Sequence, residues 1–185
     1  GNGGNAENII IRGHSKVTAT ASDGAAIGGG SAGWGSYYGG SAKGIVICDH
    51  ATVAARSDTG DGAAIGAAAG DNGKDTEAEV TIGTAGATAE QEDVHVTASG
   101  CYGSAIGSGA KDTKVTIQGH ATIRMESSRN STAIGSNYGD VEVNIKDNVT
   151  INAKDEGTSI RYEGGGSGIG GGDIRGDSNR KVVVN

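Results

Sequence analysis

Three histidines recur at one position of a repeated segment, and they are the residues in this chain whose type and spacing could bind a metal. His14, His50 and His120 each stand three residues after the last Ile of a short apolar run. If successive segments stack, His14 and His50 become neighbours, but a zinc site needs three or four ligands of suitable geometry. We therefore expect a row of polar turn side chains, with metal binding by these histidines left as an open question.

Aromatic residues gather in a glycine-rich loop after the first segment. Trp34, Tyr37 and Tyr38 lie within Ser31–Gly40, and the loop holds the only Trp and two of the five Tyr. Tyr102 and Tyr138 lie close to later repeats of the same pattern. Aromatic rings with a polar tip suit the faces of sugar rings, so these five residues are candidate carbohydrate contacts along one edge of the molecule. The alternative is that the loop folds back and pads the fold.

Acidic residues at 71–77 could contact calcium. Asp71, Asp75 and Glu77 are weak candidate ligands, because their spacing differs from that of an EF-hand loop. We expect a solvated acidic turn and no required cofactor, with calcium the one ion that this loop could bind.

Two further features carry little chemistry. Arg175, Gly176 and Asp177 form a weak cell-attachment tripeptide in a glycine-rich stretch, which we interpret as coincidence. Cys48 and Cys101 fall at different positions of the repeat, and we expect no disulfide between them.

Catalysis needs converging groups, and the acids of this chain do not form a continuous row. Asp23 and Asp61 share a position four residues before a repeated Ile, but Tyr102 and Asn130 stand there in the next two repeats. We therefore predict that the chain is not an enzyme.

The elements that position these residues are repeats. The repeated tetrapeptide is a small-small-Ile-Gly pattern, found at Ala25–Gly28, Ala63–Gly66, Ser104–Gly107, Thr132–Gly135 and Ser167–Gly170. The spacings between the Ile residues are 38, 41, 28 and 35, and the variation falls in the turns. Constant strands joined by variable loops are typical of a solenoid.

Each repeat also holds two short strands joined by a turn. The last Ile of the first strand precedes the next inward residue by six positions, as in Ile11 and Val17. The third repeat breaks this rule: its sixth position is Thr88, Ala85 replaces the histidine, and an extra strand-like run follows at 94–97. A sixth repeat begins at Val182–Val184. Period-2 alternation indicates strands with one buried face.

These patterns predict an all-β fold: a right-handed parallel β-helix of about five coils, forming one domain over residues 1–185. The repeated Ile residues should form one internal row at the strand spacing of roughly 4.8 Å. A β-sandwich is the alternative, but it gives no reason to repeat one tetrapeptide.

The pattern of strand, Gly or Asp, His or Asn, strand, loop and Gly-Ala-x-Ile-Gly-Gly-Gly resembles the glycine-rich β-helix repeats of bacterial cell-surface and secreted proteins. The resemblance covers Asn8 to Gly172. It implies a right-handed β-helix, an extracellular or cell-surface location, and roles in adhesion or carbohydrate binding. The chain start, Gly1-Asn2-Gly3-Gly4-Asn5, is typical of a processed fragment, so we expect a part of a larger surface protein.

The charge and hydropathy of the sequence limit the classes of partner that this protein is expected to bind. The formal net charge is −7, which argues against nucleic acid, and the sequence has no apolar run long enough to insert into a membrane. We predict a non-catalytic surface module that binds a host or bacterial glycan or a surface protein. The alternatives are a structural spacer or stalk without a small ligand and, less favoured, a β-helix enzyme acting on polysaccharide.

Overall fold

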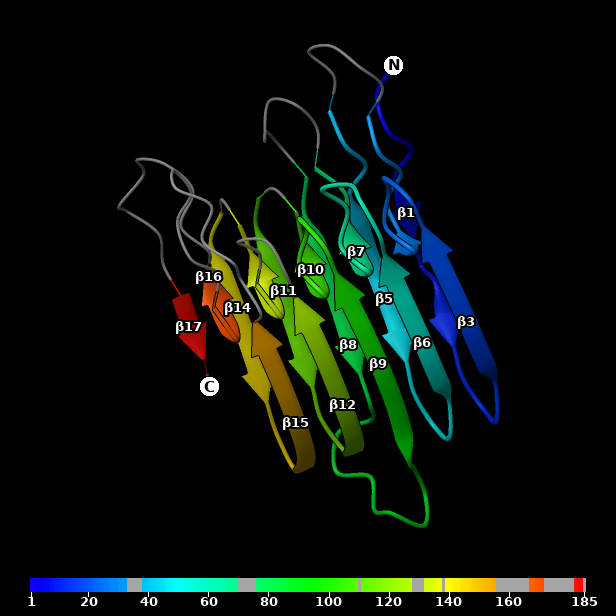
Figure 1. Cartoon of the computed structure of the whole chain (residues 1–185). Helices are drawn as coiled ribbons and strands as arrows, with labels where there is room; N and C mark the ends of the chain where they lie inside the picture. The colour runs from blue at the N-terminus through cyan, green and yellow to red at the C-terminus, as the bar shows by residue number, and fades with distance from the viewer. Residues whose placement is uncertain are drawn as a thin grey trace.

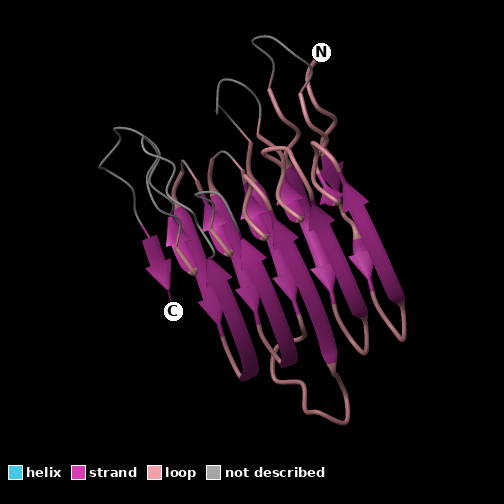
Figure 2. Ribbon diagram, in the orientation of Figure 1, coloured by secondary structure: helices cyan, strands magenta, loops and turns pink. Residues whose placement is uncertain are grey.

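The computed structural model describes residues 1–32, 38–69, 76–109, 111–127, 132–137, 139–155, 167–171 and 182–184. The regular elements in these ranges are all strands, and every pairing between named strands is parallel. Within the same ranges there is no helix that could cross a membrane. Figure 2 shows this strand-only architecture.

Three parallel sheets make up the fold, and we call them sheets A, B and C. Sheet A contains β1 (Ala6–Glu7), β2 (Ile10–Ile11), β5 (Ala42–Ile47), β8 (Ala78–Ile82), β11 (Thr113–Ile117), β14 (Val141–Ile145) and β17 (Val182–Val184). Sheet B contains β3 (Lys16–Ala21), β6 (Thr52–Ser57), β9 (Val94–Gly100), β12 (His120–Ser127) and β15 (Asn148–Asp155). Sheet C contains the short strands β4 (Ile27–Gly28), β7 (Ile65–Ala67), β10 (Ile106–Ser108), β13 (Ile134–Ser136) and β16 (Ile169–Gly171).

Each coil contributes one strand region to each sheet, in the order A, B, C. The chain runs down sheet A, reverses at a lower turn, runs up sheet B and returns through sheet C while it advances along the axis (Figure 1). Coils one to five end at β4, β7, β10, β13 and β16, and β17 begins a sixth. The predicted right-handed parallel β-helix of about five coils is therefore confirmed.

Rows of like residues fill the interior. The predicted row of tetrapeptide isoleucines is confirmed, because the register pairs Ile27, Ile65, Ile106, Ile134 and Ile169 in succession. A second row in sheet A joins Ile11, Ile47, Ile82, Ile117 and Ile145, and a row in sheet B joins Val17, Val53, Val96, Ile123 and Ile151. Each coil thus buries the apolar side chains of the next, which a single coil could not do.

The lower turn between sheets A and B requires a left-handed residue in four of the coils. Gly13, Asp49, Gly119 and Asp147 have φ angles of 69°, 63°, 72° and 64°. Gly and Asp are the residue types that tolerate this conformation, as the sequence pattern indicates.

The glycine of each tetrapeptide has a steric role as well as a conformational one. At Gly107 the φ angle is 133°, and a Cβ atom there would lie 2.1 Å from the carbonyl oxygen of Gly135 in the next coil. Only glycine lets stacked coils approach this closely at the Ile-Gly corner.

Coil three departs from the predicted repeat in one respect. Residues 94–97 are not an extra strand: β9 is the sheet B strand of coil three, in register with β6 and β12. Residues 83–93 are instead an enlarged lower turn, so the inward residue of this coil is Val96 and not Thr88. The spacing rule failed because the insertion lies inside the turn, which the solenoid tolerates at its edge.

Candidate functional site

The histidine row follows the lower turn, and coil three contributes an aspartate to it. The rings of His14 and His50 stack with their centroids 4.8 Å apart and their planes at 9°. In coil three the histidine position is occupied by Asp93 and not by Ala85. The N–H of Asp93 donates to Asp49 O in the preceding coil, and the N–H of His50 makes the equivalent bond to Gly13 O. The row therefore reads His14, His50, Asp93, His120 and Asn148.

Asp93 connects two histidines. Its Oδ2 lies 3.1 Å from His95 Nε2 and its Oδ1 lies 3.4 Å from His120 Nδ1. The hydrogen bond with His95, helped by the charges of His95 and His120, lowers the pKa of Asp93 below its ordinary value of 3.8. In the part of the chain that the structure describes, no group of three or more His, Cys, Asp or Glu side chains is arranged to hold a metal ion.

Carboxylates, and not histidines, bond the backbone of the lower turns. Asp49 Oδ2 accepts the N–H of Gly13 at 3.0 Å, one coil away. Asp147 Oδ2 accepts the N–H groups of Gly119 at 3.0 Å and Gly86 at 2.9 Å. These backbone bonds lower the pKa of Asp147, because they favour the ionised carboxylate.

Glu92 serves the same purpose from a buried position. Its side chain is 1% exposed, and Oε1 accepts the N–H of Asp49 at 3.1 Å. Oε2 accepts the N–H of Thr84 at 2.9 Å and lies 3.4 Å from the N–H of His120. One carboxylate thereby connects the turns of coils two, three and four.

Sequence reasoning missed Glu92 and Asp93, although a signal was present. Val94 and Ala51 occupy equivalent positions in coils three and two, by the register of their sheet B strands. Glu92 and Asp93 precede Val94 in the same way that Asp49 and His50 precede Ala51. An alignment anchored on sheet B would have found both residues, whereas our spacing was anchored on sheet A and was displaced by the insertion.

Tyr38 borders a small hollow beside the first coil. The hollow has a volume of about 270 Å³ and is lined by Asn2, Gly3, Asn5, Tyr38, Gly39 and Ser41. Tyr38 is 43% exposed, one of the most exposed large apolar residues among those described.

The hollow is held in place by bonds between the chain start and the segment before β5. Asn2 Oδ1 accepts the N–H of Tyr38 at 3.2 Å, and the N–H of Gly3 donates to Tyr38 O at 2.8 Å. Asn5 Oδ1 accepts the N–H of Ser41 at 3.0 Å. The backbone of Tyr38 is therefore fixed beside amide and hydroxyl groups, and its partly exposed aromatic side chain borders the hollow, an arrangement that could bind a sugar ring through its face and its hydroxyls.

Of the other aromatic residues predicted to contact carbohydrate, only Tyr102 lies among the described residues. Trp34, Tyr37 and Tyr138 lie outside the described residues. Tyr102 is partly buried on the connection from sheet B to sheet C, whereas Tyr38 lies on the connection from sheet C to sheet A. Tyr38 and Tyr102 therefore do not share one connection of the coil.

The remaining sequence candidates are placed as follows. Asp71 and Asp75 of the acidic loop and Arg175, Gly176 and Asp177 of the tripeptide also lie outside the described residues. Glu77 is described and pairs with Lys43 at 2.7 Å, which raises the pKa of Lys43. Cys48 and Cys101 are not joined by a disulfide, and burial raises the pKa of the Cys48 thiol.

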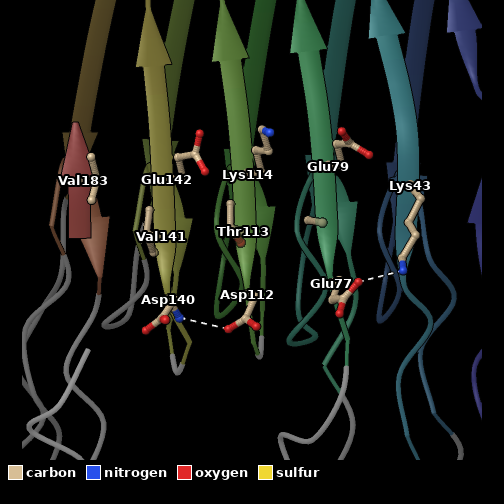
Figure 3. Close-up of a pocket in the computed structure, with 11 residues that line it drawn as sticks. Lys43, Glu77, Glu79, Asp112, Thr113, Lys114, Asp140, Val141, Glu142 and Val183 are labelled. Atoms are coloured by element: carbon tan, nitrogen blue, oxygen red, sulfur yellow. Dashed lines mark hydrogen bonds and ion pairs between the residues drawn. The ribbon is translucent and has the colours of Figure 1, made fainter. Parts of the chain in front are cut away.

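A larger, charged hollow lies on the outer surface of sheet A (Figure 3). It has a volume of about 640 Å³ and crosses β5, β8, β11, β14 and β17. Its charged lining consists of Lys43, Glu77, Glu79, Asp112, Lys114, Asp140 and Glu142. Carboxylates outnumber lysines here, in contrast to the hollow beside Tyr38, whose lining residues carry no charged side chain.

Comparison with protein-family models, with curated proteins and with solved structures finds no match for this chain. The sheet topology defines the class of protein, which is a parallel β-helix repeat protein. Because a fold of this kind does not determine activity, function has to be argued from the outer surface.

Proposed function

We propose that this protein is a non-catalytic module of an extracellular or cell-surface protein and that it binds carbohydrate beside Tyr38. The observation that carries the proposal is an exposed tyrosine, held through its backbone, beside a hollow of about 270 Å³ whose other walls include Asn2, Asn5 and Ser41. Sugar binding sites combine an aromatic face with a few polar groups that orient the hydroxyls. The resemblance to glycine-rich surface repeats supports the extracellular setting.

The test is a glycan and polysaccharide screen followed by titration of the strongest ligand. Tyr38→Ala should weaken binding at least about tenfold, since it removes the ring, and Tyr38→Phe should retain most of it. Tyr102→Ala is the matched control on another connection, and Trp34→Ala tests the neighbouring loop residue. Equal affinity of Tyr38→Ala and the unmodified protein would remove this site.

A structural spacer is the second candidate function. It is favoured by the unbroken register of the interior rows over five coils. Such a solenoid needs no ligand and holds its two ends at a fixed separation. A clean negative in the glycan screen at millimolar sensitivity would make this the preferred function.

A further inference from the structure

The two broad faces of the solenoid carry different charge. We call the outer surface of sheet A face A and the outer surface of sheet B face B. Figure 1 shows the two sheets as the broad layers of the molecule, with the short strands of sheet C at one end. Both faces consist of side chains that alternate with the interior rows along each strand.

Face A is acidic near the start of its strands. Along one row the exposed residues are Glu7, Lys43, Glu79, Lys114 and Glu142. Just before the strands lie three more carboxylates, Glu77, Asp112 and Asp140, around the hollow of about 640 Å³. One of the two lysines, Lys43, is already paired with Glu77.

Face B presents more cations than anions on its strands. Its exposed, outward charges are Lys16, Arg56, Arg124 and Lys154 against Glu126. The Arg56 and Arg124 side chains are 68% and 67% exposed, and they pair with Asp58 and Glu126 respectively. The rest of this face includes the small side chains Thr18, Ala54, Thr97 and Thr122 together with the exposed ring of His95.

Most of the opposite charges lie at the same end of the molecule, the exception being Lys16, which begins β3 next to the lower turn. Sheet A strands run toward the lower turn and sheet B strands run away from it, so the start of β8 and the end of β6 share the upper end (Figure 1). On face B, Arg56 shares a row with Glu126 and Lys154. This row and the Glu79 row of face A therefore lie at similar heights. A second copy shifted sideways without rotation would bring the two rows together coil by coil, with Lys114 opposite Glu126 and Glu142 opposite Lys154. In coil two it would place Lys43 opposite Arg56, but each of these cations is already paired with a carboxylate of its own copy.

We propose that copies of this chain associate laterally, with face A of one copy against face B of the next. Two flat sheets can approach to roughly 10 Å, so the arginine side chains of face B can reach into the charged hollow of face A. Ile10, which is 60% exposed, and Val46 add apolar contact from face A opposite the small residues of face B. The contact uses two different patches, so it does not close and adds copies in a row.

The experiment is sedimentation velocity of three proteins at about 0.02 M and about 0.5 M salt, which changes the screening of surface charge. The unmodified protein should reach a weight-average mass about twofold or more above its 18.1 kDa at low salt and return to it at high salt. A face A variant, Glu79→Lys with Glu142→Lys, and a face B variant, Arg56→Glu with Arg124→Glu, should each remain monomeric.

Mixing the two variants provides the decisive arm. Each variant alone has lost one of the two opposite charges, because the substitutions neutralise the acidic face A or reverse the sign of the basic face B. The mixture again contains an unmodified face A and an unmodified face B and should associate at low salt. The face A variant has a smaller net charge than the native −7, so simple charge repulsion predicts more association where this proposal predicts less. Circular dichroism of each variant controls for folding.

Three results would overturn the proposal: an unmodified protein that is monomeric at low salt, variants that associate as it does, or a mixture that stays monomeric. The first would leave face A to a basic partner other than this chain. Tyr38→Ala should associate like the unmodified protein, so loss of glycan binding and loss of lateral association are separate outcomes.

Discussion

Replacing Glu92 by Gln tests whether one buried carboxylate holds the lower turns of three coils together. The substitution keeps the size of the side chain but converts one oxygen to an NH₂ group that cannot accept a hydrogen bond. In its best orientation the amide keeps its oxygen on Thr84 and His120 and turns its NH₂ group toward the N–H of Asp49. A hydrogen bond to a charged group contributes roughly 1.5–3 kcal/mol, so we expect a loss of about 2–3 kcal/mol in the free energy of unfolding.

The assay is urea unfolding combined with amide hydrogen exchange. Hydrogen exchange is needed because coils can open separately. In Glu92→Gln, the amides of Asp49 and Thr84 should exchange faster than in the unmodified protein, and the amides of the interior isoleucine row should change less. Glu90→Gln is the matched control, because Glu90 is exposed and lies in the same loop, and it should change stability by less than about 0.5 kcal/mol. Equal stability of Glu92→Gln and Glu90→Gln would refute the reasoning.

Three further substitutions test the backbone, the core and the acid response. Gly107→Ala should lower the free energy of unfolding by more than about 4 kcal/mol or prevent folding. Gly13→Ala should lower it by only about 1–2 kcal/mol, because a Cβ atom there would contact no other atom. Thermal unfolding compares the two variants. Ile106→Ala should cost about 2–5 kcal/mol in urea because the side chain is fully buried, and Ile10→Ala at an exposed position should cost little. For Asp147 the folded pKa is lowered, so its stabilisation is present above 3.8 and is lost as the pH falls through the folded value. Asp147→Asn should therefore flatten the stability–pH curve below pH 3.8, and an unchanged curve would contradict this role.

Much of the fold could be predicted because the residues of the interior rows recur at recognisable positions of the sequence repeat. The isoleucine of each tetrapeptide is followed by glycine and preceded by a small residue, and the same three properties are needed at the corner of every coil. Period-2 alternation then placed the inward residues of sheets A and B. These features depend only on neighbours along the chain and on the repeat.

The surface was harder to predict because its contacts join residues from different coils. The enlarged turn of coil three displaced the count by which Ala85 was assigned to the histidine row, and Asp93 occupies that place. The part played by Glu92 depends on three amides that only the folded turns bring together. For Tyr38, the sequence indicated an exposed ring, but the amide-lined hollow depends on the pairing of residues 2–5 with residues 38–41.

The shared register of the coils makes the length of this protein adjustable in whole steps. Ser104 and Thr132 occupy equivalent places 28 residues apart, and Ile106 and Ile134 follow them in the same row. If residues 106–133 were removed, Ala105 would form the peptide bond with Ile134 that Ala133 forms in the native chain. Every later strand would keep its inward side chains in the correct interior row. Gene segments of one coil could thus be lost or duplicated without redesign of the remainder, so evolution can alter the reach of such a molecule while its chemistry stays constant.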